Sequence, residues 1–310
     1  MISLNQMTNN ISEQIARNLC KENYKIDQNG ILHSEYLRDP ETLHSKNVWE
    51  KIYNFDMDAF KKDRDDFFRS KLEDHINHIR KSYVFNPSSI CLEIGSGPAY
   101  IGEYIMKEFD SFYAGIDFNY EMLLTVKKYF DQKGFKKYLL IYGDIKNMPV
   151  KDNVIDFIYS GGVIEHFPNT GLVLRELYRV LKAGGVSFNS VPCFNFSWIF
   201  LRSFANIPST GAATNGGPSA PIFLKKVFEY IHIGLLKNKI LDKFYGYELS
   251  FTRNSLRKLH ERNGFKDITI GPFACHPSIR KLRNPILRKL YFNVQKSGLT
   301  SFFHYVFAKK

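Results

Sequence analysis

Three acidic residues and a pair of glycines stand at the ends of apolar runs in the middle of the sequence. The run Ile-Cys-Leu-Glu-Ile at residues 90–94 leads into Gly95-Ser96-Gly97, and helical apolar spacing follows from Tyr100 to Phe109. A turn without Cβ atoms lets a ligand lie directly on the backbone. The N–H groups at the start of the following helix favour a carboxylate or a phosphate. This pattern predicts a buried strand, a tight turn and a helix that together bind an anionic ligand.

Two more acids end the next apolar runs. Asp117 closes the run at 112–117, about 20 residues past the glycine turn, a spacing that suits hydrogen bonds to two ribose hydroxyls. The following Phe118 can lie against an adenine ring. A lone acid after a strand can also be a helix N-cap, but its pairing with the glycine turn favours the ribose role. The apolar run at 138–142 leads into Gly143 and then Asp144.

The position of the glycines separates two ligand classes. A nicotinamide-type dinucleotide site requires G-x-G-x-x-G, but Tyr100 stands at the third glycine position. The stretch beginning at Glu93 instead resembles the first motif of the class I S-adenosylmethionine (SAM)-dependent methyltransferases, Glu/Asp-x-Gly-x-Gly-x-Gly. Ala99 replaces the last glycine of that motif.

Further motifs in the order of this family cover about residues 89–192. Gly143-Asp144-Ile145 is similar to the family loop whose carboxylate accepts a hydrogen bond from the adenine amino group. VIEHF at 163–167 and RELYRVLKAGGVSFNSVP at 175–192 resemble the small-molecule branch that includes the ubiquinone and menaquinone methyltransferases. The resemblance implies SAM as cofactor and no metal. The implied cofactor-binding residues are Glu93, Gly95, Ser96, Gly97, Asp117, Phe118, Asp144, Ile145 and Ser160.

Strands that alternate with helices predict an α/β fold with right-handed crossovers and a parallel sheet. The resemblance implies a Rossmann-like sheet of seven strands with helices on both faces. Its last strand, at 302–308, is expected to lie antiparallel between its neighbours. We divide the chain into a helical cap (1–87), a SAM-binding core (88–192), a helical and loop insertion that acts as an acceptor lid (193–246), and the C-terminal part of the sheet with a basic insertion at 276–300 (247–310). The segment before residue 87 is expected to be helical, and Gly184-Gly185 is expected to end a helix before a strand at 186–191.

Methyl transfer is an in-line displacement, so the enzyme must orient the acceptor and remove a proton where the acceptor is a hydroxyl. His166 follows the fourth strand of the core and has an ordinary pKa near operating pH, which makes it the candidate base, with Glu165 as the second candidate. A structural role, with the imidazole bonded to backbone, stays open for His166. Cys193 follows Pro192, but RNA cytosine methyltransferases carry that pair after the fourth strand, so a buried cysteine is the simpler interpretation.

Composition limits the partners. The net charge is +12 with a pI near 9.3, which favours nucleic acid, an anionic membrane or a phosphorylated substrate. The four cysteines form no C-x-x-C pair, and the N-terminus has neither a basic start nor an apolar run, so we expect a cytoplasmic protein. The basic stretches 225–243 and 280–296 either form a solvated face, bind nucleic acid, or attach the protein to an anionic membrane. We prefer the last.

The predicted function is methyl transfer to a heteroatom, with oxygen first, of a small-molecule, sugar or lipid-linked acceptor. An RNA-modifying methyltransferase and a SAM-binding protein without turnover are the alternatives. The sequence predicts neither the acceptor nor the oligomeric state.

Overall fold

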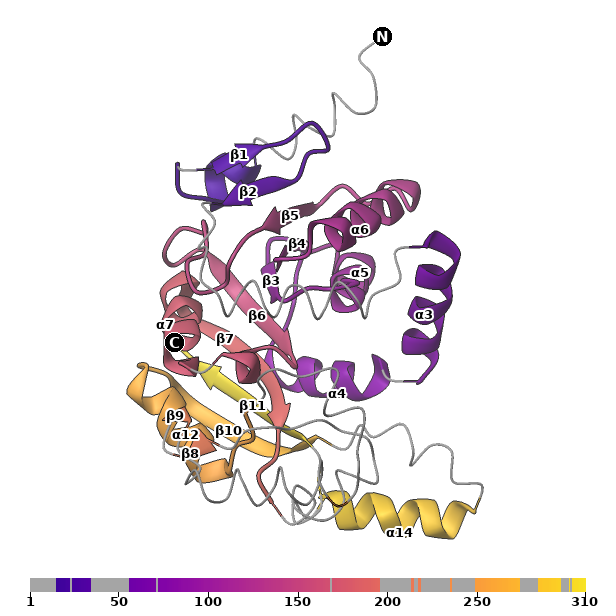
Figure 1. Ribbon diagram of the computed structural model, residues 1–310, viewed down its shortest axis with the longest axis vertical. Coiled ribbons are helices and arrows are strands. Elements are labelled where there is room, and N and C mark those ends of the chain that lie inside the picture. Colours follow the sequence, from indigo (N-terminus) through magenta and orange to yellow (C-terminus); the bar gives the residue numbers. More distant parts are fainter. Residues whose placement is uncertain are drawn as a thin grey trace.

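The structure is a computed structural model that describes residues 15–22, 24–34, 56–70, 72–167, 169–195, 213–214, 217–218, 235, 249–273, 284–296, 301 and 303–310. The elements in chain order are β1 (Tyr24–Ile26), β2 (Leu32–Ser34), α3 (Met57–Ser70), α4 (Leu72–Ser82), β3 (Ile90–Ile94), α5 (Tyr100–Phe109), β4 (Phe112–Asp117), α6 (Tyr120–Gln132), β5 (Tyr138–Tyr142), β6 (Ile155–Gly161), the 3-10 helix η1 (Ile164–His166), α7 (Thr170–Val180), β7 (Leu181–Pro192), β8 (Ala213–Thr214), β9 (Gly217–Pro218), α12 (Arg253–Arg262), β10 (Lys266–Phe273), α14 (Pro285–Lys296) and β11 (Phe303–Lys309). Figure 1 shows them arranged around one large central sheet.

The central sheet has the strand order β1-β2-β5-β4-β3-β6-β7-β11-β10. Strands β5, β4, β3, β6 and β7 run parallel to one another. Strand β11 pairs antiparallel with both β7 and β10, which confirms the prediction that the last strand lies antiparallel between its neighbours. The seven strands from β5 to β10 are therefore the predicted Rossmann-like sheet.

Two further strands extend this sheet beyond the predicted seven. Residues 24–34 form the antiparallel hairpin β1–β2 rather than a helix, and β2 pairs parallel with β5. The Asp27 carboxylate accepts hydrogen bonds from the N–H groups of Asn29 and Ile31, and Gly30 has a φ of +75°. These features form a tight turn in this segment, which interrupts any helix.

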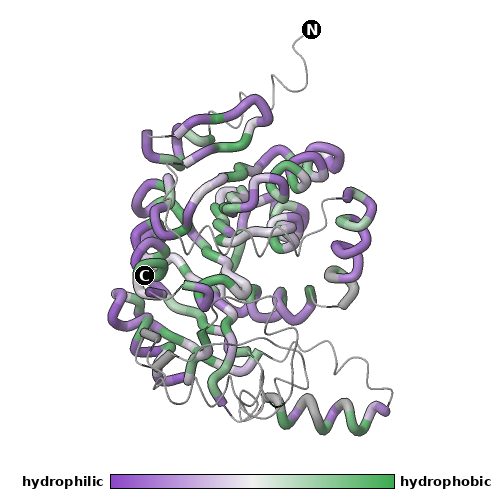
Figure 2. Tube along the Cα trace, in the orientation of Figure 1, coloured by the Kyte–Doolittle hydropathy of each residue, from purple (hydrophilic) through white to green (hydrophobic). Residues whose placement is uncertain are grey.

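Helices cover both faces of the sheet. On one face, α3, α4, α5 and α6 pack against apolar side chains of the strands in two clusters of buried residues. On the other face, α7, α12 and the residues before β1 enclose a third cluster. Figure 2 shows hydrophobic residues along the central strands and hydrophilic residues along much of the helices, as this layered packing requires.

The boundary between α7 and β7 differs from the sequence prediction. Helix α7 ends at Val180 and β7 begins at Leu181, so Gly184 and Gly185 lie inside the strand and do not end the helix. The pairing with β6 is irregular here, because the ladder passes from the pair Ile155–Leu181 directly to the pair Phe157–Val186. Gly184, with a φ of +78°, accommodates the irregularity.

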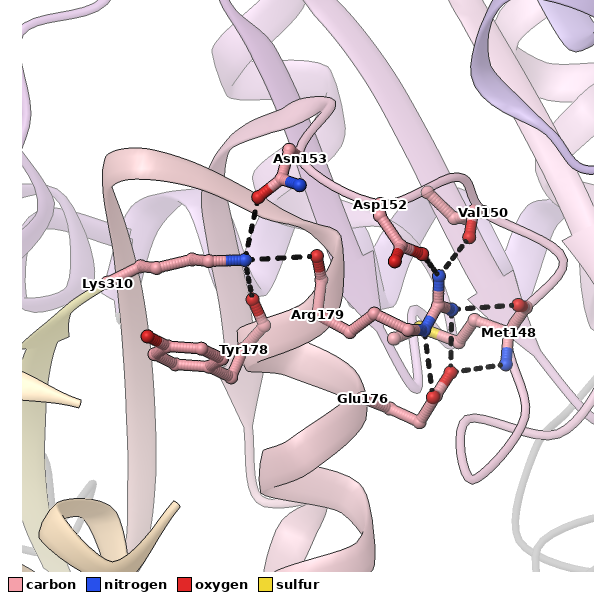
Figure 3. Close-up of polar contacts among 8 residues, drawn as sticks. All are labelled: Met148, Val150, Asp152, Asn153, Glu176, Tyr178, Arg179 and Lys310. Atoms are coloured by element: carbon pink, nitrogen blue, oxygen red, sulfur yellow. Dashed lines mark hydrogen bonds and ion pairs between the residues drawn. The ribbon is translucent and has the colours of Figure 1, made fainter. Parts of the chain in front are cut away.

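An arginine and the C-terminal lysine fasten the end of α7 to the connection before β6 (Figure 3). The Arg179 guanidinium donates hydrogen bonds to four groups, the carbonyls of Met148 and Val150 and the carboxylates of Asp152 and Glu176. Lys310 Nζ donates to the carbonyls of Tyr178 and Arg179 at the end of α7, where carbonyls lack helical partners. This network lies at the amino end of β6, so it stabilises the fold on the side away from the strand ends that carry the predicted site.

Parts of the predicted organisation fall outside the described residues. These parts are most of the insertion at 193–246, including the basic stretch 225–243 apart from residue 235, and the first section of the basic stretch 280–296. Among the helices that the structure describes, none has both the length and the apolar character needed to cross a membrane.

Candidate functional site

The site is built at one edge of the sheet. Strands β3, β4, β5 and β6 are parallel neighbours, so their carboxyl ends lie at the same edge. The glycine loop follows β3, Asp117 ends β4, Asp144 follows β5, and Ser160 lies near the end of β6. Ligands of open α/β sheets bind at this edge. The fold thus brings together at one edge the segments that were predicted from separate parts of the sequence to bind the cofactor.

The glycine loop is held in a conformation that few residue types adopt. Gly95 has a φ of +56° and Gly97 a φ of +46°, which is left-handed backbone. The loop is attached to β4, since the Ser96 N–H donates to the carbonyl of Ile116 at 3.1 Å and the Gly97 N–H to the Asp117 carboxylate at 2.7 Å. Two N–H groups of the loop are therefore used within the protein.

Glu93 lies behind this loop. Its side chain is buried, and its carboxylate accepts a hydrogen bond from the Tyr113 hydroxyl at 2.7 Å. Burial raises the pKa of Glu93 to about 8, although hydrogen bonds from the Tyr113 hydroxyl and the Gly102 backbone act in the opposite direction. In this structure the carboxyl group is bonded to protein groups and supports the strand and α5.

Asp117 joins two loops of the site. One carboxylate oxygen accepts from the Gly97 N–H, and the other accepts from the Asn119 N–H at 2.8 Å. Burial raises the pKa of Asp117, and these backbone hydrogen bonds oppose that shift. The Phe118 N–H also bonds this carboxylate. A carboxylate offers about four acceptor positions, so capacity for a further donor such as a hydroxyl group remains. Phe118 beside it is half-buried.

Asp144 and Ile145 follow β5 at the same edge and are both buried. The Asp144 carboxylate accepts from the Lys146 N–H at 2.8 Å and lies 3.6 Å from Lys146 Nζ. The β1–β2 hairpin borders this loop, because a Cβ added at Gly143 would lie 2.2 Å from Ser34 Oγ. The hairpin therefore fixes the loop from outside the seven-stranded core.

The candidate base residues lie in η1, directly after β6. Glu165 is 1% exposed, and its carbonyl accepts a hydrogen bond from the Leu249 N–H at 2.8 Å. His166 is half-buried, and its N–H donates to the carbonyl of Val163 at 3.1 Å. Both residues thus lie at the carboxyl edge of the sheet, and His166 is the more accessible of the two.

A buried polar pair lies beneath η1. Ser160 on β6 and Asn189 on β7 are paired in the ladder, and both are 0% exposed. Within the described part of the chain, neither Ser160 Oγ nor Asn189 Oδ1 has a hydrogen-bond partner. Buried polar atoms usually have one. Asn189 was not selected from the sequence, although an amide within the apolar run of β7 was the signal that could have found it.

A cysteine nucleophile and a metal site are the two remaining candidates for chemistry. Cys193 is 0% exposed, and its sulfur lies 3.3 Å from Ser301 Oγ, which confirms the prediction that it is buried. Cys275 lies outside the described residues. In the described part of the chain, no group of three or more His, Cys, Asp or Glu side chains is arranged to hold a metal ion.

The comparisons with known proteins agree with this geometry. Residues 92–188 match the family described as a methyltransferase domain. The demethylmenaquinone methyltransferase of Staphylococcus saprophyticus is 36% identical over 169 residues, which are 52% of this chain and 62% of the relative. The sterol 24-C-methyltransferase of Pneumocystis carinii is 27% identical over 229 residues, which are 67% of this chain and 58% of the relative.

Solved structures share the fold. The phosphoethanolamine N-methyltransferase 2 of Haemonchus contortus, in complex with S-adenosyl-L-methionine, superposes with a TM-score of 0.51 at 14% identity, covering 78% of this chain and 53% of that chain. At this identity the likeness concerns the fold alone. The chain spans less than two thirds of the length of the curated relatives named above.

The strand order, the glycine loop after β3 and the family match define a class I SAM-dependent methyltransferase fold. This chain carries a domain of that class, and within the class it resembles the quinone methyltransferases.

Proposed function

We propose that this protein transfers a methyl group from SAM to a heteroatom, with oxygen first, of a small-molecule, sugar or lipid-linked acceptor. The observation that carries the proposal is the meeting of the glycine loop, Asp117 and Asp144 at one carboxyl edge of the sheet. The names of the relatives add support, since they act on a quinone or a sterol. The name of the sterol relative specifies carbon as the methylated atom, so a carbon acceptor is the alternative outcome of the assay.

The cofactor roles follow from the position of each group. Asp117 has acceptor capacity for a ribose hydroxyl, and Phe118 is sufficiently exposed to lie against the adenine. Asp144 and the Ile145 N–H would meet the adenine edge. The glycine loop, including Ser96, would lie under the amino-acid part, with the N-terminus of α5 favouring its carboxylate. Ser160 would border the cofactor at β6, and Glu93 would support the loop from behind.

SAM, when bound, would supply its methyl group to an acceptor atom held in line with the carbon–sulfur bond, with the sulfur as the leaving group. A hydroxyl acceptor must lose its proton, and His166 is the proposed base. Its partial exposure favours it over Glu165, whose side chain is buried. Positioning of the two reactants supplies much of the rate in such a displacement.

Calorimetric titration with SAM and with its demethylated product tests the cofactor site. We expect micromolar binding by the wild type, loss of binding in Asp117→Ala, and wild-type binding in Asp152→Ala. Asp152 is a matched control because its carboxylate lies at the Arg179 network, away from the site. Since Asp117 also holds backbone N–H groups, Phe118→Ala is the second variant, with an expected loss of at least tenfold. A folded wild type that ignores SAM would refute the proposal.

Labelled methyl transfer into cell extracts and lipid fractions then tests catalysis. His166→Ala should lower turnover while SAM affinity stays within about twofold, and an unchanged rate would remove His166 from the mechanism. Cofactor binding without transfer into any fraction would indicate a binding protein without turnover. Co-purified RNA together with a steep salt dependence of binding would indicate the RNA-modifying alternative.

We also propose that α14 brings the protein to an anionic membrane surface. Ile286, Leu287, Leu290 and Val294 are 77%, 53%, 60% and 41% exposed, and helical spacing places them within an arc of about 100°. Lys289 on the same helix is exposed, and no acidic residue occurs between 276 and 300. Apolar side chains beside cations are typical of helices that lie in the membrane interface.

Sedimentation with vesicles of anionic or zwitterionic lipid tests this contact. We expect binding to anionic vesicles at low salt and a loss of at least fivefold in Ile286→Ser/Leu290→Ser. Val84→Ser is the matched control, because Val84 is 84% exposed but does not belong to α14. Equal binding of the three proteins, or no binding at low salt, would refute the proposal.

A further inference from the structure

An arginine from the N-terminal part of the chain is buried against the glycine loop. Arg64 lies on α3 and is 1% exposed, although arginine is rarely buried in proteins. The charge must be compensated there, since an isolated buried cation is very costly. The contacts of its guanidinium therefore indicate what the residue does.

Those contacts are directed at the end of the glycine loop. Nη1 donates to the carbonyl of Pro98 at 2.5 Å, and Nη2 donates to the carbonyl of Ala99 at 3.1 Å. Nε donates to the Glu103 carboxylate, in an ion pair whose two side chains are both largely buried. The planar fork of arginine suits such a set of fixed acceptors.

Aromatic rings complete the enclosure of the guanidinium. Its central carbon lies 4.4 Å from the ring centroid of Tyr129 and 5.2 Å from those of Phe60 and Tyr100. Cation–π attraction at such distances stabilises the charge where water is absent. Side chains from α3, α5 and α6 thus fix the position of Arg64.

The dipole of α5 does not account for a cation at this end of the helix. Ala99 is the N-cap of α5 and makes no side-chain cap hydrogen bond. The helix dipole disfavours a cation at this end. Ala99 also has a φ of +53°, a left-handed conformation that alanine rarely adopts. The hydrogen bonds from Arg64 to two consecutive carbonyls hold the backbone in that conformation.

We propose that Arg64 is a positioning residue for the cofactor loop, which makes α3 part of the SAM site. The loop is fixed at its start by Ile116 and Asp117 and at its end by Arg64. Without the second attachment, the Ala99 N–H keeps its hydrogen bond to the Ser96 carbonyl at 2.7 Å, but the carbonyls of Pro98 and Ala99 lose the Arg64 donors that hold this end of the loop against α3. We expect this end then to depart from the conformation that aims the glycine backbone and the first turn of α5 at the ligand. This inference rests on the proposed function and adds that cofactor binding requires a docked α3.

The test compares Arg64→Met, Arg64→Lys and the control Arg80→Met. Arg80 is an exposed arginine on α4 that donates to the Tyr104 hydroxyl of α5 at 2.9 Å but does not touch the loop. Each protein is titrated with SAM and with methylthioadenosine, which lacks the amino-acid part, and its folded fraction is measured by urea unfolding. The dissociation constant is expressed per folded molecule, so a loss of stability alone does not change it.

In Arg64→Met we expect SAM affinity to fall at least tenfold, methylthioadenosine affinity less than threefold, and Arg80→Met to bind as the wild type does. Arg64→Lys should recover little, because one ammonium group cannot bond both carbonyls and Glu103 as the fork does. Wild-type SAM affinity in Arg64→Met, or an equal loss for both ligands, would overturn the inference. If Arg64→Met does not fold, Arg64→Lys carries the test, and wild-type affinity there overturns the inference. Failure of the wild type to bind SAM would instead refute the proposed function.

Discussion

Gly95→Ala tests whether the glycine loop and the segment after β6 are packed as closely as the structure has them. A Cβ built at Gly95 would lie 2.7 Å from Cγ2 of Val163, closer than such atoms approach in proteins, and at a tight 3.0 Å from Cγ1. The φ of Gly95 is +56°, so alanine is strained there even without the contact. Val163 precedes η1, so the contact joins the cofactor loop to the segment that carries the candidate base.

Two terms set the size of the effect. Left-handed backbone costs an alanine about 1–2 kcal/mol, and overpacking adds about 1–3 kcal/mol, so we expect Gly95→Ala to lower the free energy of unfolding by about 2–5 kcal/mol. Gly134→Ala isolates the first term. Gly134 has a φ of +78° and no atom within 4 Å of a built Cβ, so only about 1–2 kcal/mol is expected there.

A double-mutant cycle measured by urea unfolding separates the two terms. Val163→Ala alone should cost about 1 kcal/mol, because the side chain is only partly buried. The double variant with Gly95→Ala should be less destabilised than the sum of the two single variants by about 1–3 kcal/mol, since Val163→Ala removes the methyl groups that meet the new Cβ. This account of the packing would be refuted if Gly95→Ala and Gly134→Ala lowered the free energy of unfolding equally and if the effects of Gly95→Ala and Val163→Ala were additive.

Three further predictions concern stability. The pKa of Glu93 is raised to about 8 by burial, so the folded state binds the proton more tightly and the wild type should lose stability as pH rises from about 4.5 to 8, whereas Glu93→Gln should lack that slope in urea unfolding. The Asn119 side chain accepts from the Met122 N–H at 3.0 Å at the start of α6, so Asn119→Ala should cost about 1 kcal/mol in the same assay. Burial acts to raise the pKa of Asp27, but hydrogen bonds led by that from Tyr120 lower it below its ordinary 3.8. The hairpin should therefore lose stability as pH falls below about 4, and Asp27→Asn should remove that dependence.

Each of these predictions has an opposite result. A wild-type stability that rises between pH 4.5 and 8 by an amount that Glu93→Gln removes would contradict the direction of the Glu93 pKa. An Asn119→Ala protein as stable as the wild type would show that the cap contributes nothing. Equal pH profiles below pH 4 for the wild type and Asp27→Asn would assign the acid sensitivity of the hairpin to other groups.

Several elements could be predicted because their signals are local. The helix at Tyr100–Phe109 and the strand at 138–142 have the predicted bounds, since apolar periodicity and flanking turn residues define them. The end of α7 could not be placed, because Gly184-Gly185 is a stop signal in isolation but forms a strand irregularity once β6 lies alongside. The β1–β2 hairpin was missed for a related reason, as its strands depend on pairing with β5, which is distant in the sequence.

The sequence by itself determined the class of the protein. The motif of Glu93 and the two glycines, and the acids Asp117 and Asp144 at or just after the ends of the next two strands, are recognised from residues that are neighbours in the sequence. The sequence also identified which side chains lie at the carboxyl edge, because parallel strands place their ends together. Only the tertiary structure decided how those groups are held. The Tyr113 hydroxyl donates a hydrogen bond to the Glu93 carboxylate, and the Gly97 N–H donates one to an oxygen of Asp117. Arg64, on a helix more than 30 residues earlier in the sequence, donates one to the carbonyl of Pro98. Contacts between distant segments depend on how the helices pack on the sheet, and this packing produces no repeating pattern of residue types in the sequence.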